Sequence, residues 1–394
     1  MNKKTLFLIL SLMLLVIIIV MTEFQFDLTK RLIKKNKNVL HQPAEIIKNE
    51  QPTMTGSACD AEFPQSDYIK TAYAETNPIT IKPSWGDLWF STWADDDNLY
   101  VSWGDGEGFG NVWTDIGIGK LTGNVPKVKT EIQHIDPQAT KQKNISKNSL
   151  TQDEIDVYKN DKPSSLLFFD GRLYAQFHSP LGDADIGYLA YSNDYGKNWI
   201  RLRQNSPWTK FISDDPKEEK SKSSNFRCMF FINMGKNYSL NTDGYVYAYG
   251  IGREWDWNKG IYLTRVKKEN ILNYNAYEYF VGLNNNEVTW SNLQDKAKAL
   301  PGINSTSQFS AIYHSEINRY LIMTESHLFE APTPWGPWAC ISKWRRKGWI
   351  GYQPGIVSKN LGSDYFWFTM AGQRGGEMDV DYRLNFGKIK LELY

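Results

Sequence analysis

The sequence predicts an all-β fold, a five-bladed β-propeller preceded by an N-terminal membrane anchor. Short strand-like segments recur at regular spacing, turn signals separate them, and no long stretch has the period of a helix. The segments form five groups of four, and each group has the order of a meander. Five repeated meanders favour a propeller over a sandwich or a barrel.

The first group begins in the segment that organises the chain, WGDLWFSTWADDDNLYVSWGDGEGF (residues 85–109), in which an acidic hairpin and a loop rich in glycine and acids follow successive strands. In the second and third groups, Asp170-Gly171 and Asp243-Gly244 are typical two-residue hairpin turns. The expected strands are Leu88–Trp93, Leu99–Trp103, Ile116–Leu121 and Val128–Ile132; Ser165–Phe169, Leu173–Phe177, Gly187–Tyr191 and Trp199–Leu202; Phe226–Asn233, Tyr245–Gly250, Gly260–Arg265 and Tyr277–Val281; Phe309–Tyr313, Tyr320–Thr324, His327–Glu330 and Trp338–Ser342; Pro354–Val357, Tyr365–Met370, Tyr382–Phe386 and Ile389–Leu393.

An open edge would expose unpaired backbone groups. We therefore expect the C-terminal strand to pair with residues near Tyr73–Ile81 and close the ring.

The N-terminus predicts attachment to a membrane. Lys3 and Lys4 precede an apolar run from Leu6 to Met21, and no cleavage site of small residues follows it. We expect an uncleaved signal anchor (1–26), a polar stalk (27–58) and the propeller domain (59–394), the alternative being a cleaved signal peptide. The domain is then extracytoplasmic, either periplasmic or at the cell surface.

Composition excludes some partners and favours others. The chain of 394 residues has 45 Lys and Arg against 44 Asp and Glu, which argues against a nucleic-acid partner bound by bulk electrostatics. Aromatic residues make up 14%, with 15 tryptophans, which suits twisted strands and also the stacking of sugar rings on indoles. Three cysteines allow at most one disulfide and a free thiol.

No cofactor is predicted, because the chain has neither a CxxC nor an HExxH motif. The run from Asp95 to Asn98 lies where other groups have hairpin turns, which favours Asx hydrogen bonds; a structural calcium ion is the alternative. The segment from Ser192 to Trp199 resembles the Asp-box turn of sialidases, in which the carboxylate of Asp194 would accept turn amides. Its expected role is structural.

Meander geometry sorts the polar residues by face. In each blade the loop that enters strand one and the loop that joins strands two and three emerge at the same end of the propeller. The residues expected there are Trp85, Asp87, Asp105, Glu107 and Asp115; Lys162, His178, Asp183 and Asp185; Asn225, Arg227, Arg253, Glu254, Trp255 and Asp256; Gln308, Glu325 and His327; Tyr352, Gln353 and Arg374. Carboxylates, cations and tryptophans that converge on one funnel are typical of a glycan site.

Several candidates also have a structural interpretation. Asp105 could cap a tight turn, Glu254 could belong to a surface ion pair, and His178 could be a satisfied loop histidine. Arg227 precedes an apolar strand and needs a charged partner if it is buried, for which Asp87 or an acidic sugar would serve.

The segment Asp87–Phe109 resembles the opening of a bacterial family known as domain of unknown function 4185. The residues in common are Asp87, Trp89, Thr92-Trp93-Ala94, Asp96, Leu99-Tyr100, Gly104-Asp105-Gly106 and Gly108-Phe109, followed later by Pro334–Trp338, Tyr352–Pro354, Asp364 and Ala371-Gly372. The resemblance spans nearly everything after about residue 60 and departs at Leu88 and Phe90. It implies a five-bladed propeller similar to glycoside hydrolases, including endo-D-arabinanases.

The expected function is cleavage of a cell-envelope or extracellular polysaccharide, arabinan-like among the options, by two carboxylates. Asp87 would be base or nucleophile, Glu254 or Glu325 the acid, and Asp105 an orienting group; the expected substrate-binding residues are Trp85, Arg227, Asn225, Gln308, Tyr352, Gln353, Trp255 and His178. Retention and inversion both stay open. The alternative is a non-catalytic propeller that binds a glycan or a protein at the membrane surface.

Overall fold

The computed structural model describes residues 54–74, 78–136, 161–179, 186–209, 224–252, 259–285, 287–305, 307–344, 351–372 and 382–394. The expected anchor (1–26) and most of the expected stalk (27–58) lie outside these residues. Within the described part of the chain, no helix is long and apolar enough to cross a membrane.

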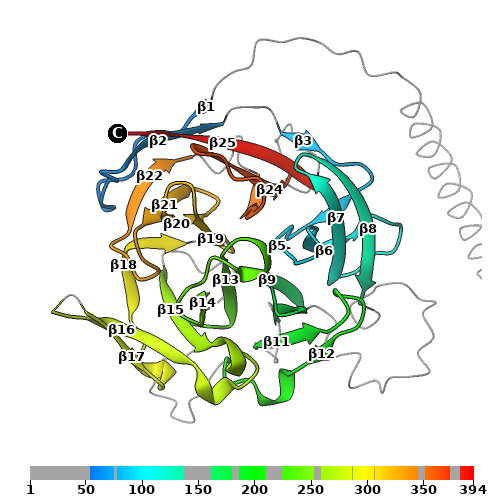
Figure 1. The fold of residues 1–394 in the computed structure, drawn as a ribbon, viewed down its shortest axis with the longest axis horizontal. Coiled ribbons are helices and arrows are strands. Elements are labelled where there is room, and N and C mark those ends of the chain that lie inside the picture. The colour runs from blue at the N-terminus through cyan, green and yellow to red at the C-terminus, as the bar shows by residue number, and fades with distance from the viewer. Residues whose placement is uncertain are drawn as a thin grey trace, which may run out of the picture. The chain divides into compact units, whose positions relative to one another are not determined.

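Five antiparallel meanders follow one another round a ring, which is the arrangement of a five-bladed β-propeller (Figure 1). Blade 1 contains β4 (Trp85–Asp87), β5 (Ser91–Trp93), β6 (Leu99–Gly108), β7 (Gly117–Asn124) and β8 (Lys127–Ile135). Blade 2 contains β9 (Lys162–Phe169), β10 (Arg172–His178), β11 (Gly187–Ser192) and β12 (Ile200–Arg201).

Blade 3 contains β13 (Cys228–Asn233), β14 (Tyr245–Ile251), β15 (Lys259–Lys267), β16 (Glu278–Asn284) and β17 (Glu287–Ser291), and β18 (Ala299–Ser305) also pairs with β15. Blade 4 contains β19 (Ser310–His314), β20 (Arg319–Met323), β21 (His327–Ala331) and β22 (Ala339–Lys343). β17 and β18 were not predicted.

Blade 5 combines the two ends of the described chain. Its strands are ordered β23 (Tyr352–Ile356), β24 (Tyr365–Ala371), β25 (Asn385–Leu393), β2 (Ile69–Ala74) and β1 (Met54–Thr55). The pairs Tyr73↔Lys390 and Ile79↔Phe386 confirm the predicted closure, and the short β3 (Ile79–Thr80) provides the second pair. β2 and β25 lie side by side at the rim of the ring (Figure 1).

Many strands begin or end a few residues from the predicted positions, and two segments are divided differently from the prediction. The segments expected at Tyr382–Phe386 and Ile389–Leu393 form one continuous strand, β25, from Asn385 onward. The first expected strand, Leu88–Trp93, is shortened to β5, and a separate strand, β4, precedes it; Leu88 between the two has a φ of +57°, outside the extended region.

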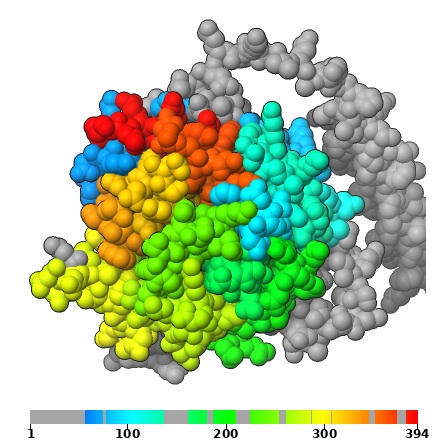
Figure 2. All heavy atoms as spheres, viewed as in Figure 1, coloured from blue at the N-terminus to red at the C-terminus, as the bar shows by residue number. Residues whose placement is uncertain are grey.

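The inner strands pack against one another round the centre. β13 and β19 pair in parallel, Ile232 opposite Ala311, so that blades 3 and 4 share one sheet. The Ser165 hydroxyl of β9 donates to the Met229 carbonyl of β13 at 2.8 Å. Figure 2 shows the atoms of neighbouring blades meeting across the middle of the ring in this view.

Turn chemistry accounts for two polar motifs at the other end of the blades. In the Asp-box, the Asp194 carboxylate accepts from the Asn198 amide at 2.9 Å, and Gly196 has a φ of +86°. In the acidic hairpin, Asp96 accepts from the Asn98 amide at 3.1 Å, the Asx bond that the sequence predicts. Both motifs are structural.

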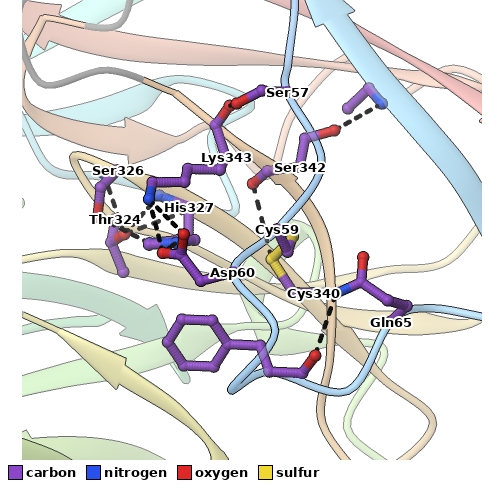
Figure 3. The surroundings of a disulfide bond; sticks show 12 residues. Ser57, Cys59, Asp60, Gln65, Thr324, Ser326, His327, Cys340, Ser342 and Lys343 are labelled. Atoms are coloured by element: carbon purple, nitrogen blue, oxygen red, sulfur yellow. Dashed lines mark hydrogen bonds and ion pairs between the residues drawn. A yellow bond between two sulfur atoms is a disulfide. The ribbon is translucent and has the colours of Figure 1, made fainter.

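A disulfide ties the N-terminal segment to blade 4. Cys59 is bonded to Cys340 of β22, while Cys228 is a buried free thiol. Beside the disulfide, Asp60 accepts from the Lys343 ammonium at 2.6 Å, and His327 lies 3.6 Å from the same carboxylate (Figure 3). The described residues before Cys59 include β1 (Met54–Thr55), which falls within the stretch expected to be a stalk.

Candidate functional site

The predicted site residues that the structure describes lie at one end of the propeller, called here the site end. This end is formed by the starts of the inner strands, the ends of the second strands and the loops between the second and third strands. The residues found there are Trp85, Asp87, Asp105, Lys162, His178, Asn225, Arg227, Gln308, Glu325, Tyr352 and Gln353. Glu254 and Trp255 lie outside the described residues.

Polar contacts at the site end join neighbouring blades. Blades 2 and 3 meet where the Gln176 amide donates to the Arg227 carbonyl at 2.7 Å. Blades 4 and 5 meet where the Gln353 backbone N–H donates to Glu325 Oε1 at 3.3 Å. The positions of the candidate side chains are therefore set by the way in which the blades pack.

Asp87 lies on β4, and its side chain is buried, with 5% of the residue exposed. The Tyr382 hydroxyl of blade 5 donates to Asp87 Oδ2 at 2.6 Å. On its other side Asp87 lies against Gly104, where a Cβ would be 3.2 Å from Asp87 Oδ1. The Trp85 ring packs edge-to-face on Tyr382, so an aromatic surface borders this carboxylate.

A second group of carboxylates surrounds Lys162, the first residue of β9. Its ammonium lies 2.9 Å from Asp105 Oδ1 and 2.6 Å from Asp115 Oδ1. Burial is the main reason that the pKa of Asp115 is raised to about 6; the Asp105 carboxyl raises it further and Lys162 opposes both. Burial would lower the pKa of Lys162, but the two carboxylates outweigh it and the pKa is raised.

Arg227 precedes β13 and is buried. Its Nε donates to the Gly252 carbonyl, and its own carbonyl accepts from Gln176. Among the described contacts, Asp87 accepts from the Tyr382 hydroxyl and Arg227 donates to a backbone carbonyl. The neighbouring Asn225 is partly exposed.

Glu325 follows β20 in blade 4 and is 5% exposed. It is held by Gln353, whose φ of +51° turns the chain at the start of β23. Gln308 is fully buried, whereas Tyr352 is partly exposed and can meet a ligand. Blade 4 therefore supplies a carboxylate at the same end as Asp87.

The two histidines have mainly structural surroundings. His178 is buried and its Nδ1 lies 2.7 Å from the Ser164 hydroxyl, which leaves its ring little access to a ligand. His327 stacks on Phe329 and faces Asp60 beside the disulfide (Figure 3).

Sequence reasoning placed Asp115 and Lys162 on this face without assigning them a role, and it missed Tyr382 altogether. Lys162 opens an otherwise apolar and hydroxylic strand, KPSSLLFF, and a charge in that position needs a buried partner. That signal could have found the cluster. Tyr382 lies far along the chain from Asp87 and nothing local marks it.

Among the residues described, no group of three or more His, Cys, Asp or Glu is arranged to hold a metal ion. A cavity of about 620 Å³ lies at the opposite end of the propeller, lined by the β9–β10 turn and by residues 268–273. It is separate from the site end and contains none of the candidate carboxylates.

Fold and site together define a five-bladed propeller whose blades bring carboxylates to one end. The chain belongs to the family described as domain of unknown function (DUF4185), whose model matches residues 111–351. That match begins after Asp87 and Asp105. No curated protein matches the sequence.

Solved structures of similar fold have low sequence identity to this chain. A candidate hydrolase from Bacteroides ovatus ATCC 8483 is 12% identical with a TM-score of 0.49, covering 88% of this chain and 97% of that one. An α-L-arabinofuranosidase from Podospora anserina is 11% identical with a TM-score of 0.42, covering 84% and 99%. A family GH62 α-L-arabinofuranosidase from Coprinopsis cinerea is 9% identical with a TM-score of 0.41, covering 84% and 98%.

Proposed function

We propose that this propeller is an extracytoplasmic glycoside hydrolase that cleaves a cell-envelope or extracellular polysaccharide. The observation that carries the proposal is the arrival of carboxylates from different blades at one end: Asp87 and Asp105 from blade 1 and Glu325 from blade 4. Glycoside hydrolysis requires two carboxyl groups on opposite sides of the scissile bond. The resemblance around Asp87 implies the same chemistry.

In this mechanism Asp87 acts as base or nucleophile. Its carboxylate is oriented by the Tyr382 hydroxyl and by the close approach of Gly104. Glu325 or Glu254 donates the proton to the leaving group, and Asp105 orients the substrate. The separation of the two carboxyl groups in the complex decides the outcome: about 5 Å gives retention and roughly 6.5–9.5 Å gives inversion.

The balance of charge favours an uncharged glycan. The described site residues include the carboxylates Asp87, Asp105, Asp115 and Glu325, and their cations are Lys162 and Arg227. Among these described residues negative charge is in excess, which opposes the binding of uronates and other acidic sugars. Trp85 and Tyr352 are partly exposed and can stack on sugar faces, so an arabinan-like substrate fits.

Location outside the cytoplasm is supported by the Cys59–Cys340 disulfide, because structural disulfides persist in oxidising compartments. The apolar N-terminal run would attach the domain to the membrane.

A non-catalytic glycan-binding propeller is the second candidate. The observation that favours it is that Asp87 and Glu325 are each 5% exposed and each hydrogen-bonded within the protein. Carboxylates held in this way suit a rigid recognition surface as well as catalysis.

The test is the release of soluble fragments from a panel of polysaccharides that includes arabinan and arabinogalactan. Asp87→Asn and Glu325→Gln are compared with Glu287→Gln, a change at an exposed carboxylate of β17. Fragments from the wild type and the control, but from neither site variant, support the hydrolase. Glycan binding without fragments from any of the proteins would establish the binding module for these substrates.

A further inference from the structure

Asp105 and Asp115 are opposed across an antiparallel strand pair. Trp103 pairs with Gly117 in the β6–β7 ladder, and Gly106 pairs with Thr114 beyond it. The same register places Asp105 opposite Asp115. Like charges in directly opposed positions destabilise a sheet, so this arrangement needs a compensating group.

Lys162 supplies that group from the neighbouring blade. Its side chain is 7% exposed, that of Asp115 is 1% exposed and that of Asp105 is 31% exposed. The Lys162 ammonium therefore contacts one buried carboxylate, that of Asp115, and one partly exposed carboxylate, that of Asp105. A lysine buried so far would be costly without both partners.

We propose that Lys162 and Asp115 are positioning residues that hold the Asp105 carboxylate in a fixed position at the edge of the substrate site. Asp115 anchors Lys162, and Lys162 orients Asp105 at the site end. The proposal rests on the function proposed above and adds to it the two residues, Lys162 and Asp115, that position the Asp105 carboxylate.

The charged groups of the cluster are Asp105 of β6, Asp115 just before β7 and Lys162 of β9. Asp87 of β4 is separated from them by Gly104, whose Cβ would lie 3.2 Å from Asp87 Oδ1 and 3.3 Å from the Asp115 carbonyl. Burial and Asp105 together raise the pKa of Asp115, while Lys162 lowers it. The raised pKa of Asp115, about 6, predicts that this cluster takes up a proton in that pH range.

The first measurement needs no substrate. Carbon-13 NMR of the aspartate carboxyl groups is followed against pH in the wild type, with Asp115→Asn for assignment. We expect one aspartate to titrate near pH 6. That signal should be lost in Asp115→Asn, should move to lower pH in Asp105→Asn and should move to higher pH in Lys162→Met.

Lys359→Met is the matched control, since the Lys359 side chain is 4% exposed and contacts Asp97 in the acidic hairpin at the opposite end. It should leave the titration unchanged. An Asp115 titration that is equal in Lys162→Met and the wild type would overturn the proposal. If Lys162→Met does not fold, Asp105→Asn still tests the proposal. Asp105 is partly exposed, so its replacement disturbs the fold less than that of Lys162.

The second measurement uses any polysaccharide that the wild type cleaves. Lys162→Met should lower kcat by about 10- to 100-fold, the loss typical when a group that orients a functional residue is removed, with KM nearly unchanged. In Lys162→Met the acid limb of the pH profile of hydrolysis should also move. In Lys359→Met it should not. An unmoved pH profile in Lys162→Met contradicts the positioning role. Absence of cleavage by the wild type would count against the hydrolase alone, and the NMR titration would still decide the pairing.

Discussion

The Tyr382 hydroxyl in blade 5 donates a hydrogen bond of 2.6 Å to the Asp87 carboxylate in blade 1. The two residues are 295 positions apart in the chain and meet only because the ring closes between its last and first blades. The candidate site therefore depends on the same closure that pairs β25 with β2 at the rim. Fold and site are coupled at this junction.

Tyr382→Phe tests that coupling. Removing the hydroxyl leaves a buried carboxylate oxygen without this donor, which should lower the free energy of unfolding by about 1.5–3 kcal/mol. Hydrolysis should fall by more than the folded fraction does, because Asp87 loses a contact that fixes its orientation. Urea unfolding and fragment release, measured on the same preparations, check both effects. Equal activity per folded molecule would show that Tyr382 does not orient Asp87.

The disulfide gives a prediction about stability. Cys59 and Cys340 are separated by 281 positions, so the bond constrains a large part of the unfolded chain. Replacing both cysteines by serine should cost about 2–5 kcal/mol. A reducing agent should lower the wild-type Tm and leave that of the double variant unchanged. Cys228→Ala is the control, because Cys228 takes no part in the bond; a wild-type Tm insensitive to reduction would contradict the prediction.

Local signals predicted the parts of this fold that local chemistry determines. Asp170-Gly171 lies in a tight turn between β9 and β10. In the Asp-box the Asp194 carboxylate accepts a hydrogen bond from a backbone amide of the turn, as expected. The pairing of the N-terminal region with the C-terminal strand was also predicted, since an unpaired edge is unfavourable. Blade geometry placed Asp87 and Glu325 at one end without any knowledge of contacts.

Contacts between blades could not be predicted in the same way. The bridge from Lys162 to Asp105 and Asp115 depends on how blade 2 packs on blade 1, and no local pattern encodes that packing. Arg227 shows the same limit: it is buried, and no local pattern indicates that its Nε donates to the Gly252 carbonyl. The sequence indicates which charges need partners, whereas the packing of the blades decides which partners they find.

Asp194 gives a prediction about pH. Hydrogen bonds from Ser192 and Asn198 outweigh the effect of burial and lower the pKa of Asp194 to about 2. A carboxylate with a lowered pKa stabilises the folded state above its unfolded pKa, and that contribution is lost as the pH falls from about 4 through 2. Asp194→Asn should therefore cost about 1 kcal/mol near pH 7, limited by solvent screening, and progressively less below about pH 4. Urea unfolding at several pH values measures the difference; a cost that stays constant with pH would exclude this linkage.

Gly104 tests the geometry beside Asp87 directly. A Cβ at this position would lie 2.8 Å from Leu88 Cδ1, 3.2 Å from Asp87 Oδ1 and 3.3 Å from the Asp115 carbonyl. Gly104→Ala should displace the Asp87 carboxylate, because the Leu88 side chain and the backbone around it are buried and have little room to move. We expect a destabilisation of about 1–3 kcal/mol.

The same change should lower kcat by roughly 100-fold, since misplacing a reacting group by about 1 Å is enough for a loss of that size. Kinetics on the fragment-release assay, normalised to the folded fraction, separate the two effects. Gly119→Ala provides a control for packing alone, because its Cβ would meet the Phe109 ring within blade 1 instead of a candidate carboxylate. If Gly104→Ala lost no more activity per folded molecule than Gly119→Ala, the reacting group would have to lie elsewhere than at Asp87.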